Sequence, residues 1–233
     1  MPGYDGRVDA SPGARLLQTA LPRDPEGVVL VLHGGGSRRD RMRVSPAQLS
    51  VLRMVPVADR VARAGRRRLA VFRLLNSVRG WDTRHTPVDD VAWALDRVRD
   101  RLGPLPTSLV GHSLGGRAAL LGGHLPGVRS VVALAPWVQP SDVRDLGGRD
   151  VLVVHGTEDR VASPARALAV AEALRSSARH AGFVSVTGGR HAMLRHHRLF
   201  DGLAADFVTA TLLGEPPRGV VAQVLDGRFL VEV

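Results

Sequence analysis

Short apolar runs alternate with longer amphipathic stretches along most of the chain. The runs are nearly continuous in Val, Leu and Ala, a pattern typical of strands in a parallel sheet that is covered on both faces. They predict strands over residues 27–35, 68–75, 107–112, 130–136, 150–156 and 182–188, with one further strand at 14–21 before them.

The stretches between these runs have helical periodicity. Residues 88–103 carry an apolar stripe, with acidic residues early, arginines late and Gly103 as a stop signal. Residues 163–182 open with Ser-Pro and close with Gly, and residues 196–214 form the last predicted helix. Strands that alternate with helices predict an α/β fold: a three-layer, doubly wound, mostly parallel sheet.

We expect one domain over residues 1–233, because no linker or internal repeat interrupts the pattern, with its core at about 14–214. The extension 219–233 contains two apolar stretches around Asp226 and Gly227, a good signal for a β-hairpin. An isolated two-stranded hairpin is only marginally stable in water. We therefore expect it to dock on a sheet edge or on a partner subunit.

Composition excludes several classes of protein. The apolar share of 44% is enough for a sizeable core, and the absence of cysteine excludes disulfides and thiolate nucleophiles. The formal charge of +10 comes entirely from arginine, but its densest clusters, 37–43 and 65–68, have no interleaved aromatic residue. A solvated surface explains them better than a nucleic-acid site. No stretch suits a signal peptide or a membrane span, so we expect a soluble cytoplasmic protein, monomeric or a small homo-oligomer, without a nucleic-acid or membrane partner.

Reactive groups in a doubly wound sheet belong beyond the carboxyl ends of the strands. The predicted strand 107–112 runs into Gly-His-Ser-Leu-Gly, residues 111–115, at the start of a helix-like segment. This pattern is either a plain tight turn or a bend that presents Ser113 as a nucleophile, with two glycines allowing close backbone approach. The N-terminus of the helix that follows would stabilise negative charge beside the serine.

A serine nucleophile needs a base, an orienting acid and a site for the oxyanion. Strand ends supply Asp159 in "HGTEDRVASP" and His191 in "TGGRHAML". Consecutive glycines in "LVLHGGGS" leave free amides, and that of Gly35, with Gly36 as a second candidate, would join the amide of Leu114. The order Ser, Asp, His is one that such triads adopt.

Four motifs, "HGGGS", "GHSLGG", "HGTEDRVASP" and "GGRHAM", together resemble the α/β-hydrolase family over about residues 28–213. The chain looks most like its small members without a lid, such as dienelactone-hydrolase-like esterases. Large members insert a lid after the strand that ends here at Pro136, and in this chain only 13 residues separate Pro136 from the next predicted strand. The resemblance implies a catalytic triad of Ser113, Asp159 and His191 and an oxyanion hole from Gly35 and Leu114. It also implies two strands before residue 27, where this sequence has room for one.

Other assignments are weighed against this one. Glu158 is a rival to Asp159, but the resemblance to the family places the acid at Asp159. His196 and His197 are rivals to His191, but they suit surface or capping roles better because they lie where the next helix begins. No pair of ligands at helical spacing suggests a metal site, and no cofactor is expected.

Candidate substrate contacts follow the strand ends. We expect Trp81, Trp137 and Met193 to line the cleft, with Val161 beside them, although the same side chains would also suit core edges. Arg79 is a candidate for binding a carboxylate.

These residues predict a serine hydrolase that cleaves carboxylic esters with small to medium acyl groups and needs no metal. A thioesterase or peptidase would use the same residues, and a non-catalytic ligand-binding protein on the same scaffold is a further alternative.

Overall fold

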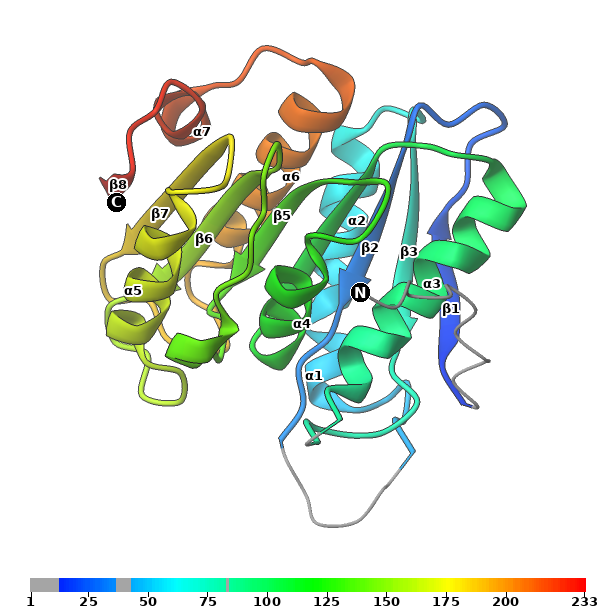
Figure 1. Ribbon diagram of the computed structural model, residues 1–233, viewed down its shortest axis with the longest axis horizontal. Coiled ribbons are helices and arrows are strands. Elements are labelled where there is room, and N and C mark those ends of the chain that lie inside the picture. Colours follow the sequence, from blue (N-terminus) through cyan, green and yellow to red (C-terminus); the bar gives the residue numbers. More distant parts are fainter. Residues whose placement is uncertain (1–12, 37–42, 83) are drawn as a thin grey trace, which may run out of the picture.

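The structure is a computed structural model that describes residues 13–36, 43–82 and 84–233. Eight strands form one sheet in the order β1-β3-β2-β4-β5-β6-β7-β8 (Figure 1). Their bounds are β1 Arg15–Ala20, β2 Gly27–Leu32, β3 Leu69–Leu75, β4 Thr107–His112, β5 Val128–Leu134, β6 Asp150–Gly156, β7 His180–Val186 and β8 Leu230–Glu232. β1 pairs antiparallel with β3, and every other neighbouring pair is parallel.

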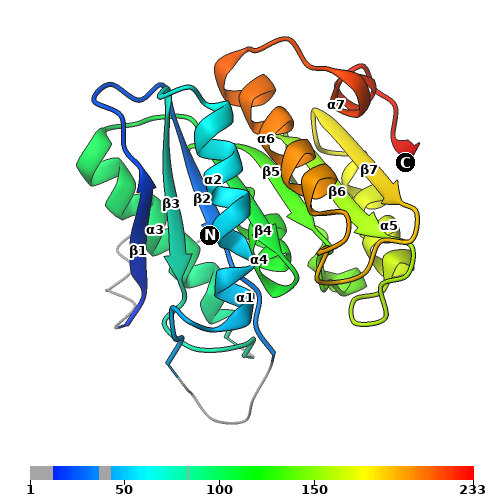
Figure 2. The same ribbon diagram turned by 180° about the vertical axis from the view of Figure 1, so that it is seen from behind.

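Helices cover both faces of the sheet, as the alternating pattern predicts (Figures 1 and 2). The helices are α1 Leu49–Leu52, α2 Met54–Ala64, α3 Thr86–Leu102, α4 Leu114–Gly122, α5 Pro164–Leu174, α6 His197–Leu213 and α7 Gly219–Leu225, with the 3-10 turn η1 Pro140–Asp142. α3, α4 and α5 pack on one face around one apolar cluster. α2, α6 and α7 pack on the other around a second cluster, which completes the three layers.

The predicted strands and the helices near 88–103 and 196–214 form with shifts of a few residues. The helix predicted at 163–182 ends at Leu174, because the segment that follows turns to enter β7. α2 was not expected. Its Pro56 lies in the first helical turn, where the missing N–H breaks no intrahelical hydrogen bond.

The C-terminal extension corrects one prediction. Residues Gly219–Leu225 form a helix rather than the first strand of a hairpin, because Val221 and Val224 lie on one helical face and bury it in the core. Gly227, with φ of 96°, turns the chain after this helix. β8 then joins the sheet edge parallel to β7, so the expected edge docking does occur, through one strand.

No helix in the described ranges is long and apolar enough to cross a membrane.

Candidate active site

Ser113 occupies a strained turn between β4 and α4. Its φ of 56° and ψ of −119° lie outside the regions that most side chains adopt, a strain that clusters at functional sites. The packing around this turn permits only glycine at positions 111 and 115. A Cβ on Gly111 would overlap the backbone of Gly115, and one on Gly115 would overlap the backbone of Leu32. The glycines of the pentapeptide are therefore required by close backbone approach, and the turn projects the serine at the carboxyl edge of the sheet.

The structure brings Ser113, His191 and Asp159 together from three different strand ends. His191 Nε2 lies 3.0 Å from Ser113 Oγ, and His191 Nδ1 lies 2.8 Å from Asp159 Oδ2. With the hydroxyl donating to Nε2 and Nδ1–H donating to the carboxylate, one tautomer satisfies both hydrogen bonds. Asp159 follows β6 and His191 follows β7, so parallel strands place both beside Ser113 at the end of β4. Such a chain of hydrogen bonds can activate a hydroxyl group.

Asp159 is held in one orientation by its surroundings. Oδ1 accepts the backbone N–H groups of Val161 and Ala162 at 2.8 and 2.9 Å, and Oδ2 accepts from His155 as well as His191. Burial alone would raise the pKa of Asp159, but the hydrogen bonds from both histidines and both amides outweigh it and lower its pKa. The carboxylate is consequently charged at neutral pH and fixed against the imidazole of His191.

The glycine-rich loop after β2 lies directly against Ser113. A Cβ on Gly34 would stand 3.0 Å from Cβ of Ser113 and 3.1 Å from the carbonyl oxygen of His112. His33 anchors this loop, since its Nδ1–H donates to the Gly34 carbonyl at 2.6 Å and its Nε2 accepts from the N–H of Asn76 at 3.2 Å. Burial lowers the pKa of His33, which favours the neutral ring that this pairing requires. The loop is thus fastened to the end of β3 beside the reacting hydroxyl.

A cavity of about 560 Å³ opens in front of these groups. It is lined by Gly34, Gly35, Gly36, Ser50, Trp81, His112, Ser113, Leu114, Arg117, Trp137, Val161 and His191. The predicted residues Gly35, Leu114, Trp81 and Trp137 therefore all reach it. Only a short segment with the turn η1 separates β5 from β6, so no lid is inserted at this point of the chain.

Met193 does not reach the cavity, which corrects its predicted place in the substrate wall. It adopts φ of 58° after His191 and is 1% exposed within the apolar cluster of α2 and α6. The turn that carries His191 buries Met193 as an anchor, because a flexible thioether side chain fills core gaps well. Val161 does line the cavity and is exposed.

The rival residues lie elsewhere. Glu158 is exposed and pairs with Arg190 at 3.2 Å, while His197 bonds the Leu194 carbonyl at the start of α6. Arg79 packs near Gly35 but does not line the cavity.

Three supporting residues escape prediction from the sequence. His155 bonds Asp159 at 3.0 Å, and His112 Nε2 donates to the carbonyl of His191 at 2.8 Å. Arg53 donates to the carbonyl of Ala192 at 2.8 Å and to Asp201 at 2.9 Å, which joins the start of α2 to the loop that carries His191. Only the fold shows which groups they hold, because Asp201 lies 148 positions after Arg53.

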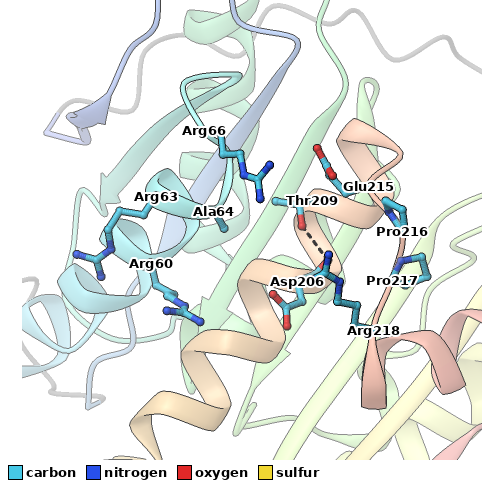
Figure 3. A pocket seen from close by; sticks show the side chains of 10 residues that line it. All are labelled: Arg60, Arg63, Ala64, Arg66, Asp206, Thr209, Glu215, Pro216, Pro217 and Arg218. Atoms are coloured by element: carbon cyan, nitrogen blue, oxygen red, sulfur yellow. Dashed lines mark hydrogen bonds between the residues drawn. The ribbon is translucent and has the colours of Figure 1, made fainter.

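A second cavity, of about 370 Å³, lies at the opposite end of the sheet between the ends of α2 and α6 (Figure 3). Arg60, Arg63, Arg66 and Arg218 line it with Asp206 and Glu215. All four arginines are exposed, and positive charge near helix C-termini complements the helix dipole, so solvation and dipole effects account for the cluster. It contains no nucleophile paired with a base.

Comparison with solved structures agrees with this architecture. No protein-family model matches the sequence, and no curated protein was found to match it. Est1E from Butyrivibrio proteoclasticus is 15% identical with a TM-score of 0.63, over 86% of this chain and 94% of its own. The thermostable carboxylesterase EstE1 from a metagenomic library is 19% identical with a TM-score of 0.67, over 85% of this chain and 84% of its own.

XC6422 from Xanthomonas campestris, described as a serine hydrolase without a lid, is 16% identical with a TM-score of 0.60. The match covers 88% of this chain and 90% of XC6422. At these identities the likeness concerns the fold. The chain has the α/β-hydrolase fold in its form without a lid.

Proposed function

We propose that this protein is a serine hydrolase that cleaves carboxylic esters of small to medium acyl groups. The observation that carries the proposal is the continuous hydrogen-bonded chain from Ser113 Oγ through His191 to Asp159, at 3.0 and 2.8 Å, facing a largely apolar cavity. Esterases and serine hydrolases among the similar structures add support at the level of the fold.

The mechanism is acyl transfer to water. His191 removes the proton of Ser113 as Oγ attacks the ester carbonyl carbon, and Asp159 holds the resulting imidazolium. The amides of Gly35 and Leu114 accommodate the oxyanion, and the loss of one such donor typically costs about 3 kcal/mol of transition-state stabilisation. His191 then gives the proton to the leaving alcohol, and water hydrolyses the acyl-enzyme by the reverse transfers.

An ester is favoured over an amide because alcohols leave more readily, and a thioester would use the same residues. A receptor that only binds ligands has no requirement for a strained serine that is hydrogen-bonded to a base. We therefore place the hydrolase above the ligand-binding alternative.

The test is a series of para-nitrophenyl esters of rising acyl length, with wild type compared with Ser113→Ala. Ser50→Ala is the matched control, because Ser50 lines the same cavity without pairing to a histidine. Hydrolysis that Ser113→Ala abolishes and Ser50→Ala retains supports the proposal. A wild-type protein that neither hydrolyses the esters nor reacts with a fluorophosphonate probe would favour the receptor.

A further inference from the structure

Arg117 lies one helical turn beyond Ser113 and lines the same cavity. Its backbone N–H donates to the carbonyl of Ser113, the N-cap residue of α4, at 3.1 Å, and both residues line the cavity. The side chain of Arg117 is only 9% exposed, an unusual place for a permanent charge.

The guanidinium of Arg117 is locked in place on several sides. Nε and Nη2 donate to the two carboxylate oxygens of Asp142 at 2.7 and 2.8 Å, a bidentate pair buried with it. The guanidinium carbon lies 4.2 Å from the ring centre of Trp81 and 5.6 Å from that of Trp137. A group held by both an ion pair and aromatic rings keeps one orientation.

Nη1 of Arg117 is the guanidinium nitrogen that does not bond Asp142. Within the described residues it has no hydrogen-bond partner, and it is not among the fully buried unpaired atoms. Among the described residues that line the cavity there is no aspartate or glutamate, so none of them offers a carboxylate that competes for its hydrogens. Because Asp142 balances the charge, the cavity presents a directed donor rather than a strong net positive field.

We propose that Arg117 is a specificity-determining residue, whose Nη1 binds a second carbonyl or carboxylate oxygen on the acyl part of the ester. This inference rests on the proposed function and adds a substrate class to it: keto-acyl or dicarboxylic half-esters in place of plain alkyl esters. An anchor on the acyl part acts in both steps, because the acyl group stays on Ser113 from acylation to deacylation.

Binding to the Ser113→Ala variant tests the inference without turnover. Methyl pentanoate, methyl levulinate and monomethyl glutarate share a five-carbon acyl chain, and the last two add a carbonyl and a carboxylate respectively. Trp81 and Trp137 flank Arg117, so tryptophan fluorescence reports binding. We expect at least one of the two oxygenated esters to bind about tenfold more tightly than methyl pentanoate, the size of one hydrogen bond to a charged donor. Whichever of these two esters binds more tightly shows whether Nη1 prefers a carbonyl or a carboxylate oxygen.

Arg117→Lys in the same background removes Nη1 while retaining a cation beside Asp142. We expect it to abolish the preference for the oxygenated esters and to leave the affinity for methyl pentanoate within about twofold, since that ester makes no bond to Nη1. Arg99→Lys is the matched control, because Arg99 and Asp96 form an exposed ion pair within α3. Equal affinities for all three esters, or a preference that survives Arg117→Lys, would overturn the inference.

A second variant guards against misfolding. If Arg117→Lys unfolds, Arg117→Met combined with Asp142→Asn removes both charges and leaves a side-chain oxygen to accept from the Gln139 amide, as Asp142 does now. Loss of the preference in this double variant supports the inference, and its persistence overturns it. Because the binding experiment needs no catalysis, its result is independent of whether wild type hydrolyses esters.

Discussion

Asp159 Oδ2 accepts hydrogen bonds from two imidazoles, His191 at 2.8 Å and His155 at 3.0 Å. His191 is partly exposed at the cavity, whereas His155 has a fully buried side chain. The carboxylate thus links a histidine that can reach a substrate with one that cannot. His155 is a positioning residue by this geometry.

Replacement of His155 tests how much its hydrogen bond to Asp159 contributes to the orientation of that carboxylate, without removing His191, which transfers the proton. We expect His155→Leu to lower kcat about tenfold and the free energy of unfolding by about 1–3 kcal/mol, because one buried hydrogen bond to a charge is lost while two amides still hold Asp159. Asp159→Asn should lower kcat by about ten-thousandfold, since an amide favours the wrong tautomer of His191. Ester hydrolysis and urea denaturation measure both effects.

The control for this pair is His124→Leu, because His124 is exposed and its side chain bonds the Leu121 carbonyl and neither Asp159 nor His191. An unchanged kcat in His155→Leu would show that the amides alone orient Asp159.

Gly34 and Gly36 form a matched pair in the glycine-rich loop. A methyl group on Gly34 would press on Ser113 at 3.0 Å, whereas at Gly36 nothing in the described part of the chain lies within 4 Å. We expect Gly34→Ala to lower kcat by about a hundredfold, through displacement of the oxyanion amides, with a change in stability within about 1 kcal/mol. Gly36→Ala should change kcat less than about twofold, because its methyl group meets no atom of the described residues within 4 Å. Equal losses in both variants would argue against the contact between Gly34 and Ser113 as the cause.

His112 makes stability dependent on pH. Burial, and next the neighbouring His191, lower the pKa of His112 from 6.5 to about 3. As the pH falls, His112 is protonated near pH 6.5 in the unfolded chain but only near pH 3 in the folded protein. The free energy of unfolding therefore decreases as the pH falls between these values.

His112→Gln removes this titration and retains a donor for the carbonyl of His191. Between pH 6 and pH 4.5, wild type should lose about 1 kcal/mol more per pH unit than the variant, below the limit of about 1.4 for one proton. Urea denaturation at several pH values measures the difference, and parallel curves would contradict the buried neutral ring.

The C-terminal extension should contribute to stability through its buried valines. Val224 is fully buried against Gly182, whereas Leu230 in the neighbouring strand is 40% exposed. We expect Val224→Ala to lower the free energy of unfolding by about 2 kcal/mol and Leu230→Ala by less than about 1, because only the first removes buried apolar volume.

Deletion of residues 219–233 should have a larger effect, since it also uncovers the edge of β7. A truncated protein with unchanged thermal stability would show that the extension is an appendage.

The pattern of apolar and polar residues was sufficient to predict strands β1 to β7, the helices α3 to α6 and the three residues that meet at the strand ends, but neither α2 nor α7. Nearly continuous apolar runs specify buried parallel strands, and parallel strands bring their carboxyl ends to one edge, so Ser113, Asp159 and His191 could be placed without coordinates. The glycines of the turn were equally readable, because only close backbone approach requires them in that pattern.

The surroundings of these residues became visible only in the folded chain. Arg117 meets Asp142 and two indoles, and Asp159 meets His155, through packing that no local pattern encodes. The same reason explains the wrong predictions for the C-terminal segment and for Met193. A valine-rich segment suits a strand or a helix until its partner surface is known, and Met193 suits a cavity wall or a core equally well. Periodicity reports that a side chain is buried, and the fold alone reports against what.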